Sequence, residues 1–282
     1  MNPAYGPNPW QQTSWDARAA CNFVFGGVGA GLIVFAVLSG AGGLALKGLV
    51  LAGLALVGLG LFCVWTEIGR PLRALHVFIN PRSSWMTREA LSATLLFPAG
   101  LAAAAAVPGF AWVAAGLALA FVYCQGRMLQ AAKGIPAWRE PLVVPLIVVT
   151  AVAEGGGAFF LAAPLGGGGT PPLDALLGAM LLLRVLLWFA YRRRLAGTVA
   201  PPARVALDAA GRLLQLAGTL APLVLIALVA SGAASGAAAA ALMAIAGLAA
   251  ALGGAYVKYA LVTRAGFNQG FMLARLPVRG SR

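Results

Sequence analysis

Charged side chains are scarce in this sequence, and their scarcity excludes a soluble globular domain. Only 10% of the 282 residues are Asp, Glu, Lys or Arg, and 61% are hydrophobic. In soluble domains, charged residues average about 25% and apolar residues about 45–50%. Apolar runs of about 20 residues, the length that crosses a bilayer, recur from one end of the chain to the other. We therefore expect an all-α integral membrane protein that forms a single polytopic domain.

Histidine and cysteine are nearly absent, which restricts the cofactors that the chain can hold. A b-type haem in a helical bundle normally has two histidine ligands, and His76 is the sole histidine. Cys21, Cys63 and Cys124 lie inside apolar runs, at spacings that fit neither a metal site nor a disulfide framework. The sequence therefore predicts no haem and no metal site. A redox centre would belong to another subunit or be a diffusible carrier.

Acidic residues are also few: 7 stand against 20 lysines and arginines, giving a net charge of +13. Such a charge is common in nucleic-acid-binding proteins. Here the basic residues lie in short loops and at the ends of apolar runs, which indicates control of membrane topology and no nucleic-acid partner. We expect no cleavable signal peptide, because the first 16 residues are polar and lack a basic n-region.

Eight membrane-spanning segments can be placed on the apolar runs. All should be helices, because a chain inside lipid satisfies its backbone hydrogen bonds internally. The predicted spans are Ala17–Leu38, Leu44–Thr66, Trp85–Val107, Gly109–Leu129, Pro141–Ala163, Ala175–Tyr191, Leu213–Ala230 and Ala237–Val262. An even number places both termini on one side. All basic residues except Lys47, including Arg184 and Lys258, are assigned to that side, which the positive-inside rule makes the cytoplasm.

Polar side chains inside the spans are functional candidates, because they are costly to place in lipid. Glu154 lies well inside the fifth span, either as a proton relay or as a neutral carboxyl hydrogen-bonded to a neighbouring helix. Asn22, in the first span, could donate to a carbonyl ligand or join two helices. Glu67, at the end of the second span, could have a functional role or could form an ion pair at the membrane boundary. The small residues of Phe25–Gly31 are expected to let helices approach closely.

The segment Thr66–Leu95 is the longest charge-bearing stretch in the first half of the chain. It carries Arg73, His76, Arg88 and Glu89. Arginine and histidine can donate hydrogen bonds to a quinone oxygen, and a carboxylate can exchange protons with a quinol. Histidine also titrates in the range that such exchange needs. The same basic loop could instead bind lipid headgroups.

Two loops in the sequence resemble those of a known family. IGRPLRALHVFINPRSSWMTREAL and GRMLQAAKGIPAWREPLVVPL are similar to segments of the membrane-anchor subunits of DMSO reductase and, more distantly, of polysulfide reductase. The matching residues are Gly69, Pro71, Arg73, Ala74, Asn80, Ser84, Arg88, Glu89, Pro136 and Trp138. The two ends of the chain resemble a subgroup that includes the anchors of phenylacetyl-CoA:acceptor oxidoreductase and sulfite dehydrogenase.

The resemblance implies a subunit of the bacterial inner membrane that holds a four-cluster iron–sulfur subunit and a molybdopterin catalytic subunit on the cytoplasmic side. Such a subunit passes electrons between the clusters and a quinone, either ubiquinone or menaquinone, and has no substrate chemistry of its own. The resemblance places Arg73 and Glu89 at the quinone site, to which we add Asn22, Glu67 and His76. The DMSO reductase anchor has histidine at the position of Glu67, so either Glu67 or His76 would handle protons.

The basic loops are then expected to dock the iron–sulfur subunit, because an electropositive face speeds encounter and fixes register. The residues predicted for docking are Arg70, Arg82, Arg88, Arg127, Arg139, Arg192, Arg193 and Arg194. A small-molecule permease is the alternative function, since it would also need many spans and buried polar groups. The sequence shows no internal inverted repeat, which counts against a permease. A scaffold without a ligand is a third possibility.

Overall fold

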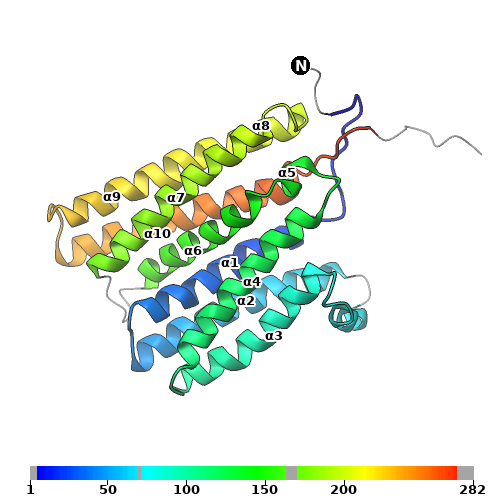
Figure 1. The fold of residues 1–282 in the computed structure, drawn as a ribbon. Coiled ribbons are helices and arrows are strands. Elements are labelled where there is room, and N and C mark those ends of the chain that lie inside the picture. Colours follow the sequence, from blue (N-terminus) through cyan, green and yellow to red (C-terminus); the bar gives the residue numbers. More distant parts are fainter. Residues whose placement is uncertain (1–4, 69–70, 163–169, 272–282) are drawn as a thin grey trace, which may run out of the picture.

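The computed structural model describes residues 5–68, 71–162 and 170–271, which form a bundle of helices (Figure 1). Two residues assigned a role above, Gly69 and Arg70, lie outside the described ranges. The main helices are α1 (Ala17–Leu38), α2 (Gly43–Glu67), α3 (Trp85–Ala104), α4 (Phe110–Ala131), α6 (Val143–Ala162), α7 (Pro171–Leu195), α8 (Pro201–Gln215), α9 (Ala221–Ala230) and α10 (Gly236–Tyr259). Shorter elements are the 3₁₀ helix η1 (Pro71–Phe78), α5 (Pro136–Arg139) and the π-helical turns η3 (Leu216–Leu220) and η4 (Ala260–Arg264).

Seven helical segments in the described part of the chain are long and apolar enough to cross a membrane. They are α1, α2, α4, α6, α7, the continuous segment Pro201–Ala230 and the segment Gly236–Arg264. The third predicted span corresponds to α3, which is not among them. Its first two turns contain Thr87, Arg88 and Glu89, so it is more polar than the others. The protein is thus an all-α multi-pass membrane protein with seven candidate spans in its described residues.

The sequence located some helix boundaries better than others. The first span matches α1 at both ends, because Asp16 ends the polar segment and caps the helix by accepting a hydrogen bond from the backbone N–H of Arg18. The predicted start of Leu213–Ala230 is wrong. The helix that contains this span begins at Pro201, because proline fits a first helical turn. Its first part, α8, is amphipathic, and the apolar part of the segment Pro201–Ala230 follows.

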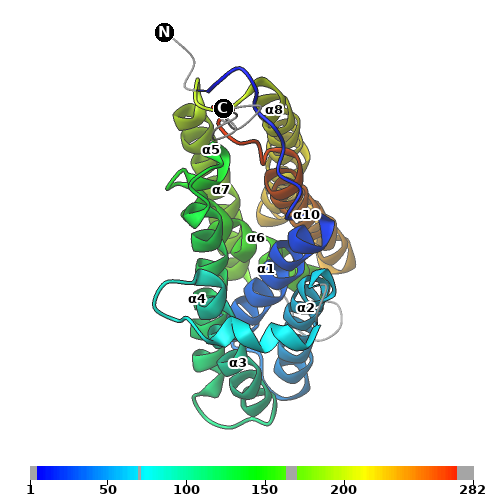
Figure 2. The same cartoon turned by 90° about the vertical axis from the view of Figure 1, so that its right-hand side faces the viewer.

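Helices α1 and α6 lie at the centre of the bundle, between α2–α4 on one side and α7–α10 on the other (Figure 2). Glycines bring the backbones of these helices together. A Cβ on Gly31 of α1 would lie 2.2 Å from the Ala151 carbonyl oxygen of α6, and one on Gly157 would lie 2.3 Å from the Gly247 oxygen of α10. The prediction that small residues of Phe25–Gly31 allow close helix packing is confirmed.

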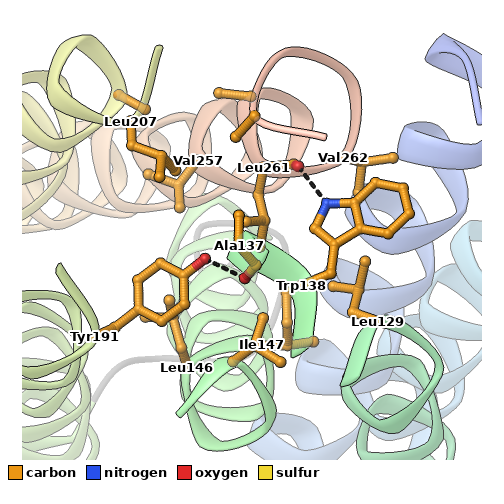
Figure 3. Close-up of a cluster of buried hydrophobic side chains, with 14 of the residues drawn as sticks. Leu129, Ala137, Trp138, Leu146, Ile147, Tyr191, Leu207, Val257, Leu261 and Val262 are labelled. Atoms are coloured by element: carbon orange, nitrogen blue, oxygen red, sulfur yellow. Dashed lines mark hydrogen bonds between the residues drawn. The ribbon is translucent and has the colours of Figure 1, made fainter. Parts of the chain in front are cut away.

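The two ends of the described chain, near residues 5 and 271, lie at one end of the bundle, together with η1 and α5 (Figures 1 and 2). The N-terminal segment pairs with the segment after α10 through backbone hydrogen bonds, with Gln11 opposite Phe267. At the same end, α5 is held by two neighbours (Figure 3). The Tyr191 hydroxyl donates to the Ala137 carbonyl over 2.5 Å, and the Trp138 indole donates to the Leu261 carbonyl over 2.8 Å. These bonds fix the end of the bundle that carries the basic loops.

Candidate functional site

A pocket of about 210 Å³ lies at the basic end of the bundle, where the start of α1 meets the end of α2 and the start of α3. Most of its wall is apolar, and Asn22, Glu67 and Glu89 supply polar groups. The lining residues are Ser14, Trp15, Ala19, Asn22, Phe23, Val64, Glu67, Ile68, Met86, Glu89 and Met128. The pocket therefore combines three of the five residues that were predicted to contact a quinone.

Glu89 is the buried carboxyl of this pocket. The side-chain oxygen of Ser84 caps α3 by accepting from the backbone N–H of Thr87, which sets the first turn so that Glu89 faces the interior. Asn22 Nδ2 donates to Glu89 Oε1 over 2.9 Å, and Gln125 Nε2 donates to the same oxygen over 3.2 Å. Two amides from α1 and α4 thus fix one oxygen of the carboxyl.

The two amides that bond Glu89 each have a side-chain oxygen that lacks a hydrogen-bond partner. Asn22 Oδ1 and Gln125 Oε1 are buried and have no hydrogen-bond partner. A buried acceptor without a partner costs free energy that a ligand with a donor could recover. Asn22 also lines the pocket, although its Oδ1 is itself buried beside Gly60.

Gln125 was missed by the sequence reasoning. It is fully buried, and its Nε2 also donates to the Asn22 carbonyl over 3.0 Å. The signal was present, since a lone amide lies among the apolar residues of a predicted span and such residues are rarely placed in lipid without a partner.

Glu67 is the last residue of α2 and lies at the edge of the pocket, partly exposed. Arg18 Nη1 donates to the Thr66 carbonyl over 3.0 Å and so joins the start of α1 to the end of α2. The Arg18 guanidinium also bonds Asp16, and this contact lowers the pKa of the Asp16 carboxyl below its ordinary value. These contacts hold the two helix ends that frame the pocket.

Arg73 and His76 do not line this pocket. Both belong to η1 and are exposed, and His76 Nδ1 lies 3.2 Å from the Arg73 carbonyl. The element η1 rests beside the pocket because the Thr87 hydroxyl donates to the Val77 carbonyl. The structure thus separates the predicted quinone residues into three in the pocket and two on the neighbouring loop.

A second buried polar centre lies between α6, α7 and α10. Lys258 Nζ donates to Glu154 Oε2 over 2.6 Å, and neither side chain is exposed. Arg184 is also fully buried, and it donates to the Ala250 carbonyl over 2.9 Å and to the Gly218 carbonyl. The assignment of Lys258 and Arg184 to the cytoplasmic face is therefore wrong, because both side chains are inside the bundle.

Glycines make room for these charges. A Cβ on Gly27 would lie 2.1 Å from Lys258 Nζ, and a Cβ on Gly254 would lie 2.6 Å from Glu154 Oε1. Because Gly27 has no side chain, Lys258 Nζ also reaches the Phe23 carbonyl, to which it donates over 2.9 Å. Phe23 lines the pocket, so this buried centre supports the wall of the first site.

The arginines predicted to dock a partner differ in how far they are engaged within the chain. Arg192 pairs with Asp208, and Arg194 lies 3.6 Å from Glu140. Arg88 and Arg127 stack on the Trp85 ring. The remaining described members, Arg82, Arg139 and Arg193, are exposed.

In the described ranges, no group of three or more His, Cys, Asp or Glu side chains is placed so that it could hold a metal ion. Cys21, Cys63 and Cys124 are free thiols. No family model and no curated protein matches the sequence.

Proposed function

We propose that this chain is the membrane-anchor and quinone-interacting subunit of a molybdopterin and iron–sulfur oxidoreductase complex in the bacterial inner membrane. It would hold the iron–sulfur and catalytic subunits on the cytoplasmic side and exchange electrons between the clusters and ubiquinone or menaquinone. The observation that supports this most strongly is the pocket that joins the buried Glu89 carboxyl and the Asn22 amide to an apolar wall. We also propose that α3 is an eighth span and that both termini are cytoplasmic.

The size and lining of the pocket suit a quinone ring. Its volume of about 210 Å³ is below the roughly 300–1,000 Å³ of pockets that enclose a whole drug-sized ligand. A ring would fit inside while its isoprenoid tail remains among the helices and lipid. Trp15, Phe23, Val64 and Met128 are among the apolar residues that line the pocket.

The two carboxyls of the pocket suit the proton exchange of quinone chemistry. Oxidation of a quinol releases electrons, which would pass to the iron–sulfur subunit, and protons, which need acceptors. Glu89, held by two amides, can accept one proton. Glu67 is partly exposed and can pass protons to the aqueous phase. In the reverse direction the same carboxyls donate protons.

The proposal places the quinone ring against Asn22, Glu67 and Glu89. It assigns Arg73 and His76 to the loop beside the pocket, because neither lines it. The predicted role of these two residues as hydrogen-bond donors to the ring therefore stays a prediction that binding data can decide.

Quinone binding to the purified chain in nanodiscs tests the proposal. A photoreactive quinone should label the peptides that contain Trp15 and Met86, and Glu89→Gln and Asn22→Ala should weaken binding. Loss of a charge-assisted hydrogen bond predicts a change of about 10- to 150-fold. Arg204→Ala is the control, since Arg204 is exposed and outside the pocket, and it should bind normally. Unchanged binding in both pocket variants, or labelling confined to another part of the chain, contradicts the proposal.

The buried charges favour a second candidate function, a proton-coupled permease. Glu154, Lys258 and Arg184 lie at the centre of the bundle, and such residues often mark ion pathways in transporters. Proteoliposomes that contain the chain alone distinguish the two functions. Solute uptake driven by a proton gradient supports the permease, whereas quinone binding without uptake supports the anchor.

A further inference from the structure

A basic hollow of about 630 Å³ lies outside the pocket described above, between the start of α3, the end of α4 and α5. Its lining contains three cations and no acidic residue. The lining residues are Ser83, Trp85, Arg127, Gln130, Ala131, Lys133 and Arg139. A concave surface with this composition is suited to an anion.

Arginine stacking on Trp85 organises the hollow. The guanidinium carbon of Arg88 lies 4.1 Å from the centre of the Trp85 ring, and that of Arg127 lies 4.6 Å from it. The Arg88 guanidinium also makes two hydrogen bonds: it donates to the Pro81 carbonyl over 3.0 Å and to the Arg82 carbonyl over 2.7 Å. Arg127 is less satisfied, because its buried Nε has no hydrogen-bond partner.

The cations of the hollow form no ion pair within the described residues. In residues 5–68, 71–162 and 170–271, the ion pairs join Arg18 to Asp16, Arg192 to Asp208, Arg194 to Glu140 and Lys258 to Glu154. None includes Arg88, Arg127, Lys133 or Arg139. Like charges held close together without a counter-ion repel one another, so an external anion would stabilise this arrangement.

The surface of α4 below Arg127 indicates the chemistry of that anion. Tyr123, Leu119, Gly116 and Trp112 precede Arg127 at helical spacings of three and four residues, so all lie on one face of α4. All four are exposed; Tyr123 is 42% and Trp112 63% exposed. This continuous apolar stripe is uncovered within the chain.

The stripe is long enough to cross the hydrocarbon part of one lipid leaflet. From Arg127 to Trp112 it extends about 22 Å at 1.5 Å per residue. Half of a hydrocarbon core is about 15 Å thick. Trp85 and Tyr123, which meet edge to face with centroids 5.8 Å apart, are typical of the membrane–water interface. An acyl chain can therefore follow α4 while its phosphate lies in the hollow.

We propose that this hollow binds the phosphate headgroup of an anionic phospholipid, with Arg127 and Lys133 as the main contacts and the acyl chains along α4. The headgroup would neutralise the guanidinium pair on Trp85. An acidic segment of a partner protein would find the cations but would make no use of the apolar stripe. Free phosphate would likewise leave the stripe uncovered.

Lipid retention by the whole chain tests this proposal. The protein would be purified from nanodiscs that mix phosphatidylglycerol with phosphatidylcholine, and the lipids that remain bound would be counted by native mass spectrometry. The wild-type chain should retain phosphatidylglycerol selectively. Arg127→Gln and Lys133→Gln should each reduce retention about tenfold or more, as expected for loss of a charge-assisted hydrogen bond.

Arg193→Gln is the matched control, since Arg193 is exposed at the same end of the bundle but outside the hollow. It should retain lipid as the wild type does. Lys133 is exposed, so Lys133→Gln keeps the test valid if Arg127→Gln does not fold. Equal loss in the control variant would overturn the proposal, as would displacement of the lipid by inorganic phosphate or by an acidic partner peptide at similar concentrations.

Discussion

Lys258 Nζ and Glu154 Oε2 lie 2.6 Å apart in the interior of the bundle, on helices that are distant in sequence. The two charges compensate each other, and the Phe23 carbonyl accepts a second hydrogen bond from the lysine. A buried pair of this kind is weak evidence for net stability, because desolvation offsets the attraction. Removing only one partner is more costly, because the remaining side chain stays buried without the charge that it pairs with.

We therefore expect Lys258→Met and Glu154→Gln each to destabilise the protein by about 3–5 kcal/mol. The double variant should recover part of this loss, because it removes both charges of the pair and leaves only Arg184, which keeps its hydrogen bonds to the Ala250 and Gly218 carbonyls. Unfolding in mixed detergent micelles measures the effect. A double variant as unstable as the sum of the single variants would show that the two side chains act independently.

Gly27→Ala should destabilise the protein through the same lysine. The new Cβ would lie 2.1 Å from Lys258 Nζ and would displace it from the Phe23 carbonyl. The loss should shrink in a Lys258→Met background. Gly48→Ala in α2 is the matched control: nothing lies within 4 Å of its Cβ, so it should be neutral or stabilising by up to about 1 kcal/mol. Similar destabilisation by both variants would point to a general effect on the helices.

Gln125→Leu should weaken the quinone site although Gln125 does not line the pocket. It removes the donor to Glu89 Oε1 and to the Asn22 carbonyl, so the carboxyl loses its fixed position. We expect reduced quinone-linked turnover, with artificial-dye activity of the assembled complex retained. Measuring both activities on one preparation separates a local effect from failed assembly, in which both would fall together.

Docking of an iron–sulfur partner should depend on Arg193 and Arg82, which are exposed and have no ion pair in the described part of the chain. Reversal of both to glutamate should weaken co-purification at low salt, and the difference from the wild type should shrink as salt is raised, because salt screens exposed charges. Arg192 and Arg194 are poorer probes, since they pair with Asp208 and Glu140. Equal recovery of the complex at low and high salt would place the docking surface elsewhere.

Topology reporters inserted near Gly42 and near Gly232 should both report the periplasm. These loops lie between α1 and α2 and between α9 and α10, at the end of the bundle opposite η1 and α5. A reporter at the C-terminus should report the cytoplasm. A cytoplasmic result from both loops would reverse the proposed orientation.

Apolar runs were enough to predict the all-α membrane fold and the limits of α1, because a polar N-cap there meets a long hydrophobic stretch. They misplaced the start of Pro201–Ala230, where an amphipathic helix continues past the apolar run. Asn22 and Glu89 were singled out as rare polar groups, and the fold does bring them together. The pairing of Glu154 with Lys258 could not be predicted, because a single sequence does not show which distant residues come into contact.

The interval of 104 residues between Glu154 and Lys258 has a consequence for biogenesis. At about 5–20 residues per second, the ribosome needs roughly 5–20 s to reach the lysine after it has made the glutamate. For that time α6 resides in the translocon or the membrane without the partner of its carboxyl, and Arg184 on α7 joins it before α10 is made. The pair can therefore form only once α10 has been made, and chains truncated before α10 should be recognised by membrane quality-control proteases.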